Sequence, residues 1–243
     1  MNHASMLLAV VLTYSVVQSV FGVGLLVFGT PTLLLLGFSF QDVLAYLLPC
    51  SIAISLLQVH EGGLTFEPVR RKFLLYTGPS VLIGTLLVLV VLNHKLNVRT
   101  IVGAMLILTA GIRLFAPLRE RMAGLIRDRL SAFLSGLGIV HGLSNLGGGM
   151  LTVIVSSLYH DKESTRKHIA FGYGVMAIIQ LSTLLATTAV TWDWHLQLLL
   201  PLVAGLTYLV LGRHVFEATK QGLYQVSLTA LIAAFGVLLV LPT

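Results

Sequence analysis

Two glycine-rich breaks inside apolar segments are the places where this sequence could do chemistry. The first is GVG at 22–24 and the second is SNLGGG at 144–149. Glycine is unfavourable inside a helix, so each break is expected to end one helix and begin another. A helix start carries up to four unpaired N–H groups and the positive end of the helix dipole, and glycine lets a ligand approach them closely. Two such starts together predict a binding site for an anion.

Polar side chains near the breaks are the candidates for contacting that anion. No Lys or Arg lies in the middle of an apolar segment, so the attraction must come mostly from backbone dipoles and neutral donors. Ser144 and Asn145 are expected at an N-cap position, where they either bind substrate or only satisfy a backbone N–H. His141 is the one ionisable residue expected deep in a span, as a functional group or as a neutral packed histidine. The expected substrate-binding residues are Gly22, Val23, Gly24, Thr30, Ser51, His141, Ser144, Asn145, Gly147, Gly148 and Gly149.

Other chemistry has little support in the sequence. The single Cys50 cannot form an intrachain disulfide and has no partner cysteine for a metal site, so neither a metal nor another cofactor is expected. The motifs GxSxG and HExxH are absent, which argues against an enzyme. Gln58 and Gln180 are interpreted as caps of their own helix ends, and Tyr173 as a packing or interfacial residue.

The elements that hold these residues are expected to be membrane spans. Of the 243 residues, 56% are hydrophobic and only 10% are charged, against about 45–50% and about 25% in globular proteins. The mean hydropathy is +0.95. Apolar runs near the roughly 20 residues needed to cross a bilayer recur along the whole chain, which predicts one membrane domain over 1–243. The net charge of +6 is expected to mark cytoplasmic loops, and no nucleic-acid partner is expected.

Ten apolar segments can be delimited by polar breaks, and six of them are long enough to span a bilayer. The segments are 5–21, 25–37, 43–58, 73–92, 99–116, 130–143, 149–159, 169–190, 195–212 and 222–241. The two segments on either side of each glycine break are short. Each such pair is therefore predicted to form a hairpin that dips into the membrane and returns to its starting side.

The placement of positive charge supports these hairpins. With both pairs folded as hairpins, all of the 15 Lys and Arg residues except Lys95 and Arg99 fall on one side of the membrane. If every short segment crossed instead, the charges would divide almost evenly between the two sides. Since cytoplasmic loops are rich in Lys and Arg, the hairpin arrangement is favoured, and it puts both termini in the periplasm.

Each half of the chain then contains one hairpin and three spans. An odd number of crossings inverts the second half relative to the first. QSVFGVGLLVFGTP at 18–31 aligns with HGLSNLGGGMLTVI at 141–154, and SIAISLLQ at 51–58 aligns with YGVMAIIQ at 173–180. We therefore expect an all-α integral membrane protein with two inverted-topology repeats, each a re-entrant broken-helix hairpin followed by three transmembrane helices. Repeat one is expected over 1–120 and repeat two over 121–243.

The glycine motifs also carry a resemblance to a known family. GVGLLVFGTP at 22–31 resembles the GxGGGxxxxP signature of the TauE/SafE sulfite exporter family, and NLGGGMLTV at 145–153 resembles its second copy. The positions that depart from the signatures are Leu25, Leu26, Asn145 and Ile154. The resemblance covers essentially the whole chain in size, in its two halves and in motif placement. It implies a transporter that exports sulfur-containing anions such as sulfite, sulfonates or thiosulfate across a bacterial inner membrane.

The expected mechanism is alternating access to a midplane site as the two repeats rock against each other. An inside-negative potential favours anion efflux by about 2.3 kcal/mol per charge per 100 mV, so a uniporter is expected. The competing mechanism is transport coupled to proton movement through His141. An anion- or small-solute-selective channel with two half-helices is the alternative function. The expected partners are a small anionic substrate and the lipid bilayer, with a homodimer as an option for assembly.

Overall fold

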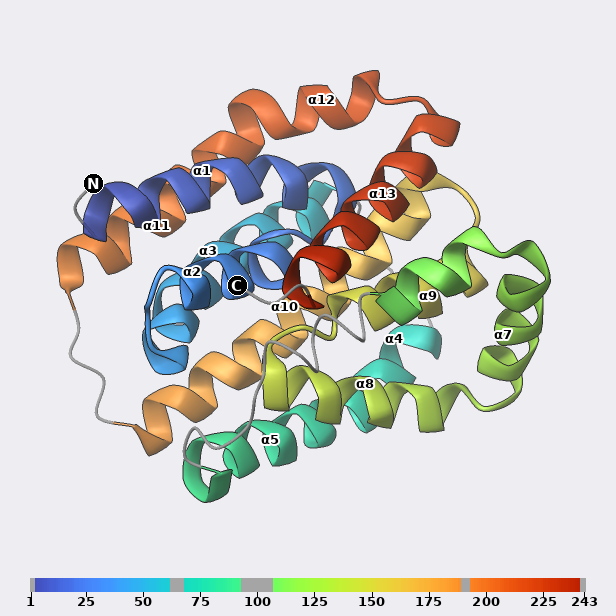
Figure 1. Cartoon of the computed structure of the whole chain (residues 1–243), viewed down its shortest axis with the longest axis horizontal. Helices are drawn as coiled ribbons and strands as arrows, with labels where there is room; N and C mark the ends of the chain where they lie inside the picture. The colour runs from blue at the N-terminus through green and yellow to red at the C-terminus, as the bar shows by residue number, and fades with distance from the viewer. Residues whose placement is uncertain (1–2, 62–67, 93–106, 189–192, 241–243) are drawn as a thin grey trace.

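The computed structural model describes residues 3–61, 68–92, 107–188 and 193–240, and every regular element in them is helical (Figure 1). The α-helices are α1 (His3–Phe21), α2 (Thr30–Leu35), α3 (Phe40–Glu61), α4 (Pro68–Lys72), α5 (Gly78–Leu86), α7 (Ala116–Asp128), α8 (Leu130–Ser144), α9 (Gly148–Leu158), α10 (Lys162–Thr187), α11 (Trp194–Thr207), α12 (Arg213–Ala218) and α13 (Gln221–Val240). The π-helical segments are η1 (Leu25–Gly29), η2 (Phe73–Thr77), η3 (Leu87–Leu92) and η4 (Tyr208–Gly212). Residues 107–114 are also helical.

Six helical runs among the described residues are long and apolar enough to cross a membrane. They are His3–Phe21, Phe40–Glu61, Pro68–Val90, Lys162–Thr187, Trp194–Ala218 and Gln221–Leu238. At a rise of about 1.5 Å per residue, runs of this length match a hydrocarbon core about 30 Å thick. The shorter apolar helices are Leu25–Leu35, Leu130–Ser144 and Gly148–Leu158. The prediction of an all-helical, multi-pass membrane protein is confirmed.

The first helix is longer than the prediction of a short segment over 5–21. α1 has 19 residues, and it is long enough to cross a bilayer by itself. It gains length because the polar His3 belongs to the helix, whereas a hydropathy reading counts only the apolar part. The predicted span over 99–116 lies partly outside the described residues.

Two other helices extend into regions predicted as loops. α10 begins at Lys162 instead of 169, and Asp161 caps it by accepting a hydrogen bond from the Ser164 N–H at 2.7 Å. α7 occupies most of the predicted loop 113–130. It mixes helix-forming Leu, Arg, Glu and Met residues with charge at nearly every turn. Such a sequence forms a surface helix that a search for apolar runs does not detect.

The first hairpin consists of α1 followed by η1 and α2. The ring of Phe38, just after α2, lies 5.1 Å from the ring of His3 at the start of α1. Gly37 ends α2 with φ 89°, and the Phe38 N–H donates back to the Leu33 carbonyl at 3.1 Å. This is a helix end that favours glycine. The chain therefore comes back to the point where the hairpin began, in agreement with the prediction.

The second hairpin consists of α8 and α9 and also comes back to its start. Arg127, just before α8, donates from Nη2 to the carbonyl of Ser157 in the last turn of α9, at 3.0 Å. The guanidinium thus satisfies a free carbonyl at the negative end of the α9 dipole.

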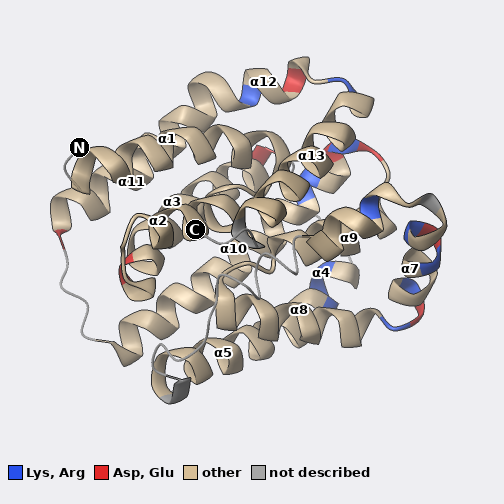
Figure 2. Ribbon diagram, viewed as in Figure 1, with Lys and Arg blue, Asp and Glu red and all other residues tan. Residues whose placement is uncertain are grey.

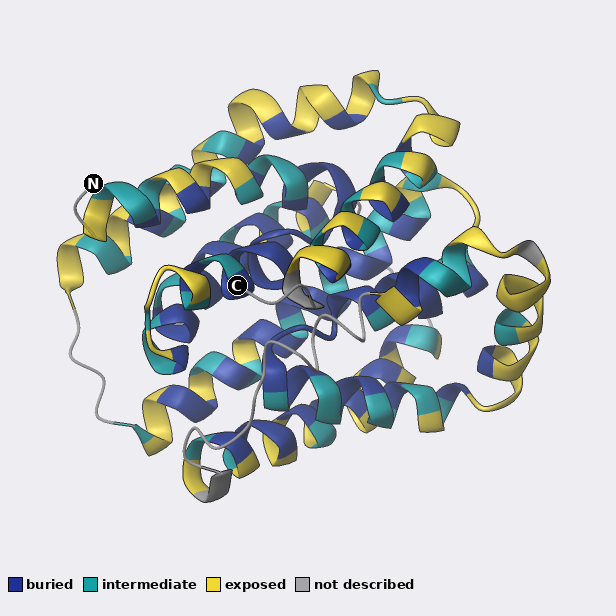
Figure 3. Cartoon of the chain, viewed as in Figure 1, coloured by how far each residue is buried: buried dark blue, intermediate teal, exposed yellow. Residues whose placement is uncertain are grey.

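The two hairpins are held by the two most buried long helices, α3 and α10. α3 packs against α1, η1 and α2, while α10 packs against α8 and α9, and the two long helices pack against each other. α11, α12 and α13 lie outside this centre and carry many exposed residues (Figure 3), which include large apolar ones. Lys and Arg gather on α4, on α7 and at the start of α10, while α12 carries only Arg213 (Figure 2).

Candidate functional site

The first break is a tight fold of the backbone against α1. α1 ends at Phe21, Gly22 has φ 76°, and Gly24 immediately precedes η1. A Cβ on Gly24 would lie 2.7 Å from the carbonyl oxygen of Tyr14, so only glycine fits there. A Cβ on Gly22 would meet the Arg166 carbonyl at 3.0 Å. These glycines are therefore required by the close approach of protein backbone.

The second break corrects the expectation that Asn145 caps the following helix. Asn145 is the C-cap of α8 and has φ 62°, a left-handed conformation that asparagine tolerates better than most residues. Gly147 holds the N-cap position of α9. Ser144 accepts a hydrogen bond from the Leu146 N–H at 3.3 Å and donates to the Val140 carbonyl at 2.6 Å. An Asn before glycines is typical of both helix ends and helix starts, so the sequence alone could not separate the two roles.

The two breaks align at an offset of 123 residues and share the residue with positive φ, but they differ at the next glycine: Gly24 has φ 176° and precedes a π-helical segment, whereas Gly147 has φ −62° and precedes an α-helix. In each, the N–H of the residue with positive φ donates to the carbonyl four residues earlier at 2.7 Å: Gly22 to Gln18 and Asn145 to His141. The equivalent pairs are Phe21 and Ser144 at the helix ends, Gly22 and Asn145 at positive φ, Gly24 and Gly147 at the N-caps, and Leu35 and Leu158 at the ends of the returning helices.

Gln58 and Gln180 tie each break to a long helix. The Gln58 Nε2 on α3 donates to the carbonyls of Gln18 and Ser19, at 3.1 and 2.8 Å, in the last turn of α1. The Gln180 Nε2 on α10 donates to the carbonyls of His141 and Gly142, at 3.1 and 3.5 Å, in the last turn of α8. The interpretation of these glutamines as caps of their own helices is therefore wrong, because they bond to the neighbouring hairpin.

The short helices that follow the two breaks lie against each other. The Asn145 Nδ2 donates to the Thr30 Oγ1 at 2.8 Å, and both residues are fully buried. A Cβ on Gly148 would collide with the side chain of Val27. Asn145 contacts Thr30, whereas Gly148, three residues later, contacts Val27, three residues earlier. The two segments therefore run in opposite directions. Their first turns overlap side by side instead of facing start to start.

At the first break, Gln18 and Ser51 satisfy each other, whereas the Gln58 Oε1 has no hydrogen-bond partner among the described residues. The Gln18 Nε2 donates to the carbonyl and Oγ of Ser51, each at 3.0 Å. The Gln18 Oε1 accepts from the Leu25 N–H at 3.3 Å, which occupies one of the free donors at the start of η1. Ser51, an expected substrate contact, is thus engaged in this internal pairing.

Polar side chains at the second break leave several atoms unpaired. The equivalents of Gln18 and Ser51 are His141 and Tyr173, whose ring centroids are 5.9 Å apart. Both ring nitrogens of His141 and the Tyr173 hydroxyl make no hydrogen bond of good geometry among the described residues, although the ring lies near the Gln180 side chain and the hydroxyl near the Val27 backbone; the Asn145 Oδ1 and the Gln180 Oε1 make none either. All four residues are 0% exposed. A buried polar atom without a partner costs about 1–3 kcal/mol, so such a cluster calls for a functional explanation.

The unpaired atoms adjoin the start of α9. A Cβ added to Gly147 would lie 3.1 Å from the His141 Nδ1, and one added to Gly148 would lie 2.8 Å from the Tyr173 hydroxyl oxygen. The first N–H groups of α9 and these side chains therefore share one buried region, which combines a helix start with neutral donors.

Among the expected site residues, this region brings together Thr30, His141, Asn145, Gly147 and Gly148. Gly22 and Gly24 lie at the first break. Tyr173 was missed as a site residue, and Gln180, a polar side chain available to the site, was interpreted as a helix cap instead. The offset of 122 that aligns 51–58 with 173–180 places Tyr173 over the expected contact Ser51, and this signal could have identified it.

The comparison with protein families gives one match over nearly the whole chain. The family model described as sulfite exporter TauE/SafE matches residues 6–239. No curated protein and no solved structure matches the chain.

Proposed function

Because the chain belongs to the TauE/SafE sulfite exporter family, whose members are membrane transporters and not enzymes, we propose that it exports small sulfur oxyanions such as sulfite or sulfonates. The transport site lies where the two short helices cross, and the second break supplies most of its contacts.

The observation that carries this proposal is the cluster of unpaired polar atoms at the start of α9. The Tyr173 hydroxyl and a His141 ring N–H can donate to an oxyanion, together with the first backbone N–H groups of α9. The Asn145 Oδ1 and the Gln180 Oε1 can accept from the histidine or from the hydroxyl of a singly protonated oxyanion. Because neutral donors bind the anion and no fixed positive charge holds it, the anion can also dissociate from the site.

Alternating access is the proposed route. The matching hydrogen bond at each residue with positive φ and the matching glutamine bonds support two inverted repeats over 1–120 and 121–243. His141, Asn145 and Tyr173 are fully buried, which favours a carrier that encloses its substrate over an open channel. The proposed orientation puts the arginine-rich end in the cytoplasm and both termini in the periplasm of a bacterial inner membrane. The membrane potential then drives anion uniport outward.

Efflux from proteoliposomes tests the site. Tyr173→Phe removes only the unpaired hydroxyl, and we expect it to weaken sulfite transport about 10- to 100-fold in kcat/KM. This range corresponds to about 1.5–3 kcal/mol for a hydrogen bond to a charged group. Tyr76→Phe, at an exposed position, is the matched control and should transport like the unmodified protein. Equal rates for both variants would mean that the site lies elsewhere.

Flux measurements in the same vesicles distinguish a carrier from a channel, and uniport from proton-coupled transport. A carrier shows saturable flux and competition between sulfite and sulfonates, whereas flux that rises linearly with concentration would show a pore. Sulfite-dependent proton movement that is lost in His141→Ala would show proton coupling and contradict uniport.

A further inference from the structure

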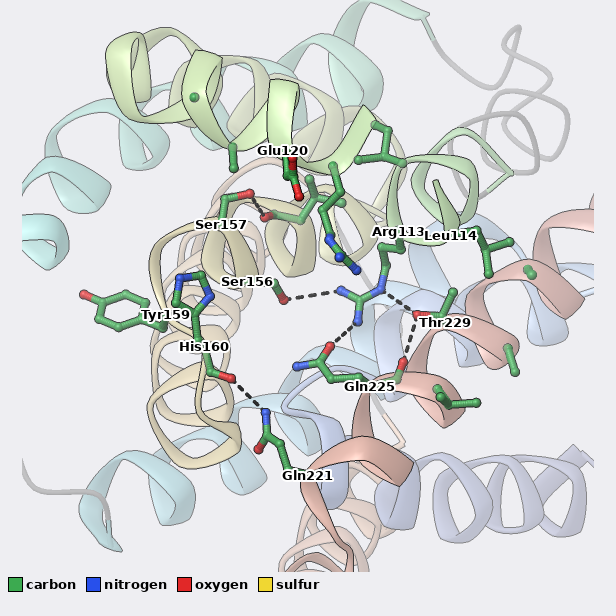
Figure 4. Close-up of a pocket in the computed structure, with 18 of the residues that line it drawn as sticks. Arg113, Leu114, Glu120, Ser156, Ser157, Tyr159, His160, Gln221, Gln225 and Thr229 are labelled. Carbon is green, nitrogen blue, oxygen red and sulfur yellow. Dashed lines mark hydrogen bonds between the residues drawn. The ribbon is translucent and has the colours of Figure 1, made fainter. Parts of the chain in front are cut away.

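A second polar region lies away from the breaks, in a cavity of about 860 Å³. Its walls come from α7, from the last turns of α9, from α13 and from the helical residues 107–114 (Figure 4). α9 thus begins at the proposed transport site and ends at this cavity.

Arginine dominates the polar wall. Arg113 donates from Nε to the Thr229 Oγ1 at 2.9 Å, from Nη2 to the Gln225 Oε1 at 2.8 Å and from Nη1 to the Ser156 Oγ at 3.3 Å (Figure 4). All three acceptors are neutral, so these bonds hold the guanidinium in position without neutralising its charge. A partly buried charge is costly unless an opposite charge accompanies it.

The neighbouring charges do not cancel that of Arg113. Arg119 and Arg127 also line the cavity, and Glu120 is the only carboxylate residue among its described lining residues. Arg127 is engaged at the end of α9 through the Ser157 carbonyl. Because that carbonyl is also neutral, all three arginines keep their charge, and together they outnumber the single Glu120 on the described wall.

Another part of the wall is apolar. It is lined by Ile112, Leu114, Val153, Val226, Ala230 and Ala233. The volume falls in the range of about 300–1,000 Å³ typical of sites for drug-sized molecules, which is far more room than a small oxyanion needs. An occupant that fits both walls has an anionic head and an apolar tail.

We propose that this cavity binds an anionic phospholipid, with its phosphate against Arg113 and Arg119 and the upper part of an acyl chain along the apolar wall. The proposal rests on the membrane orientation proposed above, which places the cavity at the cytoplasmic leaflet. Anionic headgroups of that leaflet attract basic residues. It does not depend on which anion is transported. A lipid in this place contacts the end of α9 opposite the transport site and can thereby influence the position of that helix.

Lipid binding to the purified protein in a neutral detergent tests the proposal. Phosphatidylglycerol should raise the melting temperature and add bound lipid in native mass spectrometry, while phosphatidylcholine at the same concentration should do much less. A ligand that binds only the folded protein stabilises it by mass action. Arg119→Gln should weaken phosphatidylglycerol binding about tenfold. Arg129→Gln removes the same charge from an exposed position outside the cavity and should leave binding unchanged.

A second pair of variants fills the cavity without changing charge. A Cβ on Gly124, which lines the cavity, meets nothing within 4 Å, so Gly124→Leu is expected to fold and to displace the acyl chain. Gly222, outside the cavity, has equally open surroundings and provides the control Gly222→Leu. Loss of lipid in Gly124→Leu alone supports the proposal.

Three outcomes would overturn it. Equal stabilisation by phosphatidylcholine would show a general lipid effect. Equal stabilisation by soluble glycerol phosphate, unaffected by Gly124→Leu, would show a site for free oxyanions. Equal losses in Arg119→Gln and Arg129→Gln would show attraction by overall charge. Transport activity enters none of these measurements, so the proposal can fail while the proposed function stands.

Discussion

At the level of single residues, glycine has two different roles in the breaks. Gly22 supplies a backbone conformation with positive φ, and Gly24 and Gly148 supply space. The expectation that glycine keeps the backbone open for a ligand is therefore too simple. Where Gly148 meets Val27 and Tyr173, the missing side chain lets one short helix pack against the other.

We expect Gly148→Ala to destabilise the protein by about 1–3 kcal/mol, as overpacked cores do. The new Cβ would collide with Val27 and lie 2.8 Å from the Tyr173 hydroxyl. Val27→Ala should recover part of the loss, and melting curves in detergent measure both effects. Gly222→Ala is the control because its Cβ meets nothing within 4 Å. A Gly148→Ala protein that melts like the unmodified one would contradict the close crossing of the two helices.

Variants of Gln58 and Gln180, which hold equivalent positions, distinguish an effect on stability from an effect on substrate binding. Replacing either one by Leu removes bonds to the last turn before a break, and we expect similar losses of about 1 kcal/mol in stability. Only Gln180→Leu should also weaken sulfite binding, measured by the ligand-induced shift in melting temperature, because Gln180 adjoins the unpaired cluster. Equal weakening by both variants would mean that the two breaks contribute equally to the site.

At the level of elements, the ends of helices determine how the hairpins fold. α2 is followed by Gly37 with positive φ, the end of α9 is satisfied by Arg127, and α10 is capped at its start by Asp161. The cap matters because α10 holds the second hairpin through Gln180. The Ser164 backbone N–H, by bonding to the Asp161 carboxylate, lowers the pKa of that carboxyl, which lies outside the membrane-spanning part.

We expect Asp161→Ala to lower stability at neutral pH by about 1 kcal/mol, the usual contribution of an N-cap. Because the folded pKa lies below the unfolded value of about 3.9, the charge-dependent part of this contribution is present above pH 4. It is lost as the pH falls through the folded pKa. Melting curves of the variant and the unmodified protein should therefore converge in acid. Asp161→Asn keeps a good cap without the charge, and a constant gap between it and the unmodified protein across this range would contradict the linkage.

At the level of the whole molecule, the arrangement consists of two hairpins, each packed on one long central helix, with α3 and α10 in mutual contact. Arginine and lysine gather at α4, at α7 and at the start of α10, whereas Asp42 and Asp193 lie near the starts of α3 and α11. Most of the described acidic residues lie near these basic segments, so it is the one-sided placement of Lys and Arg that supports a single orientation in the membrane.

Cysteine labelling of cells tests the orientation. In a Cys50→Ser background, cysteines at the exposed positions Ser39 and Asp193 should react with a membrane-impermeant maleimide in intact spheroplasts. Cysteines at the exposed positions Arg129 and Lys220 should react only after permeabilisation. Labelling of Ser39→Cys from the cytoplasmic side would contradict a first hairpin that begins and ends in the periplasm.

The sequence by itself determined the membrane class, the position of both breaks, the return of each hairpin and the alignment of 51–58 with 173–180. These features follow from hydropathy, from glycine placement and from charge, which act locally along the chain. The tertiary structure decided that Asn145 ends a helix and reaches Thr30, that the two short helices cross side by side, and that the unpaired atoms gather around His141 and Tyr173. Such contacts join residues far apart in the chain and depend on how whole helices pack, for which local patterns carry no information.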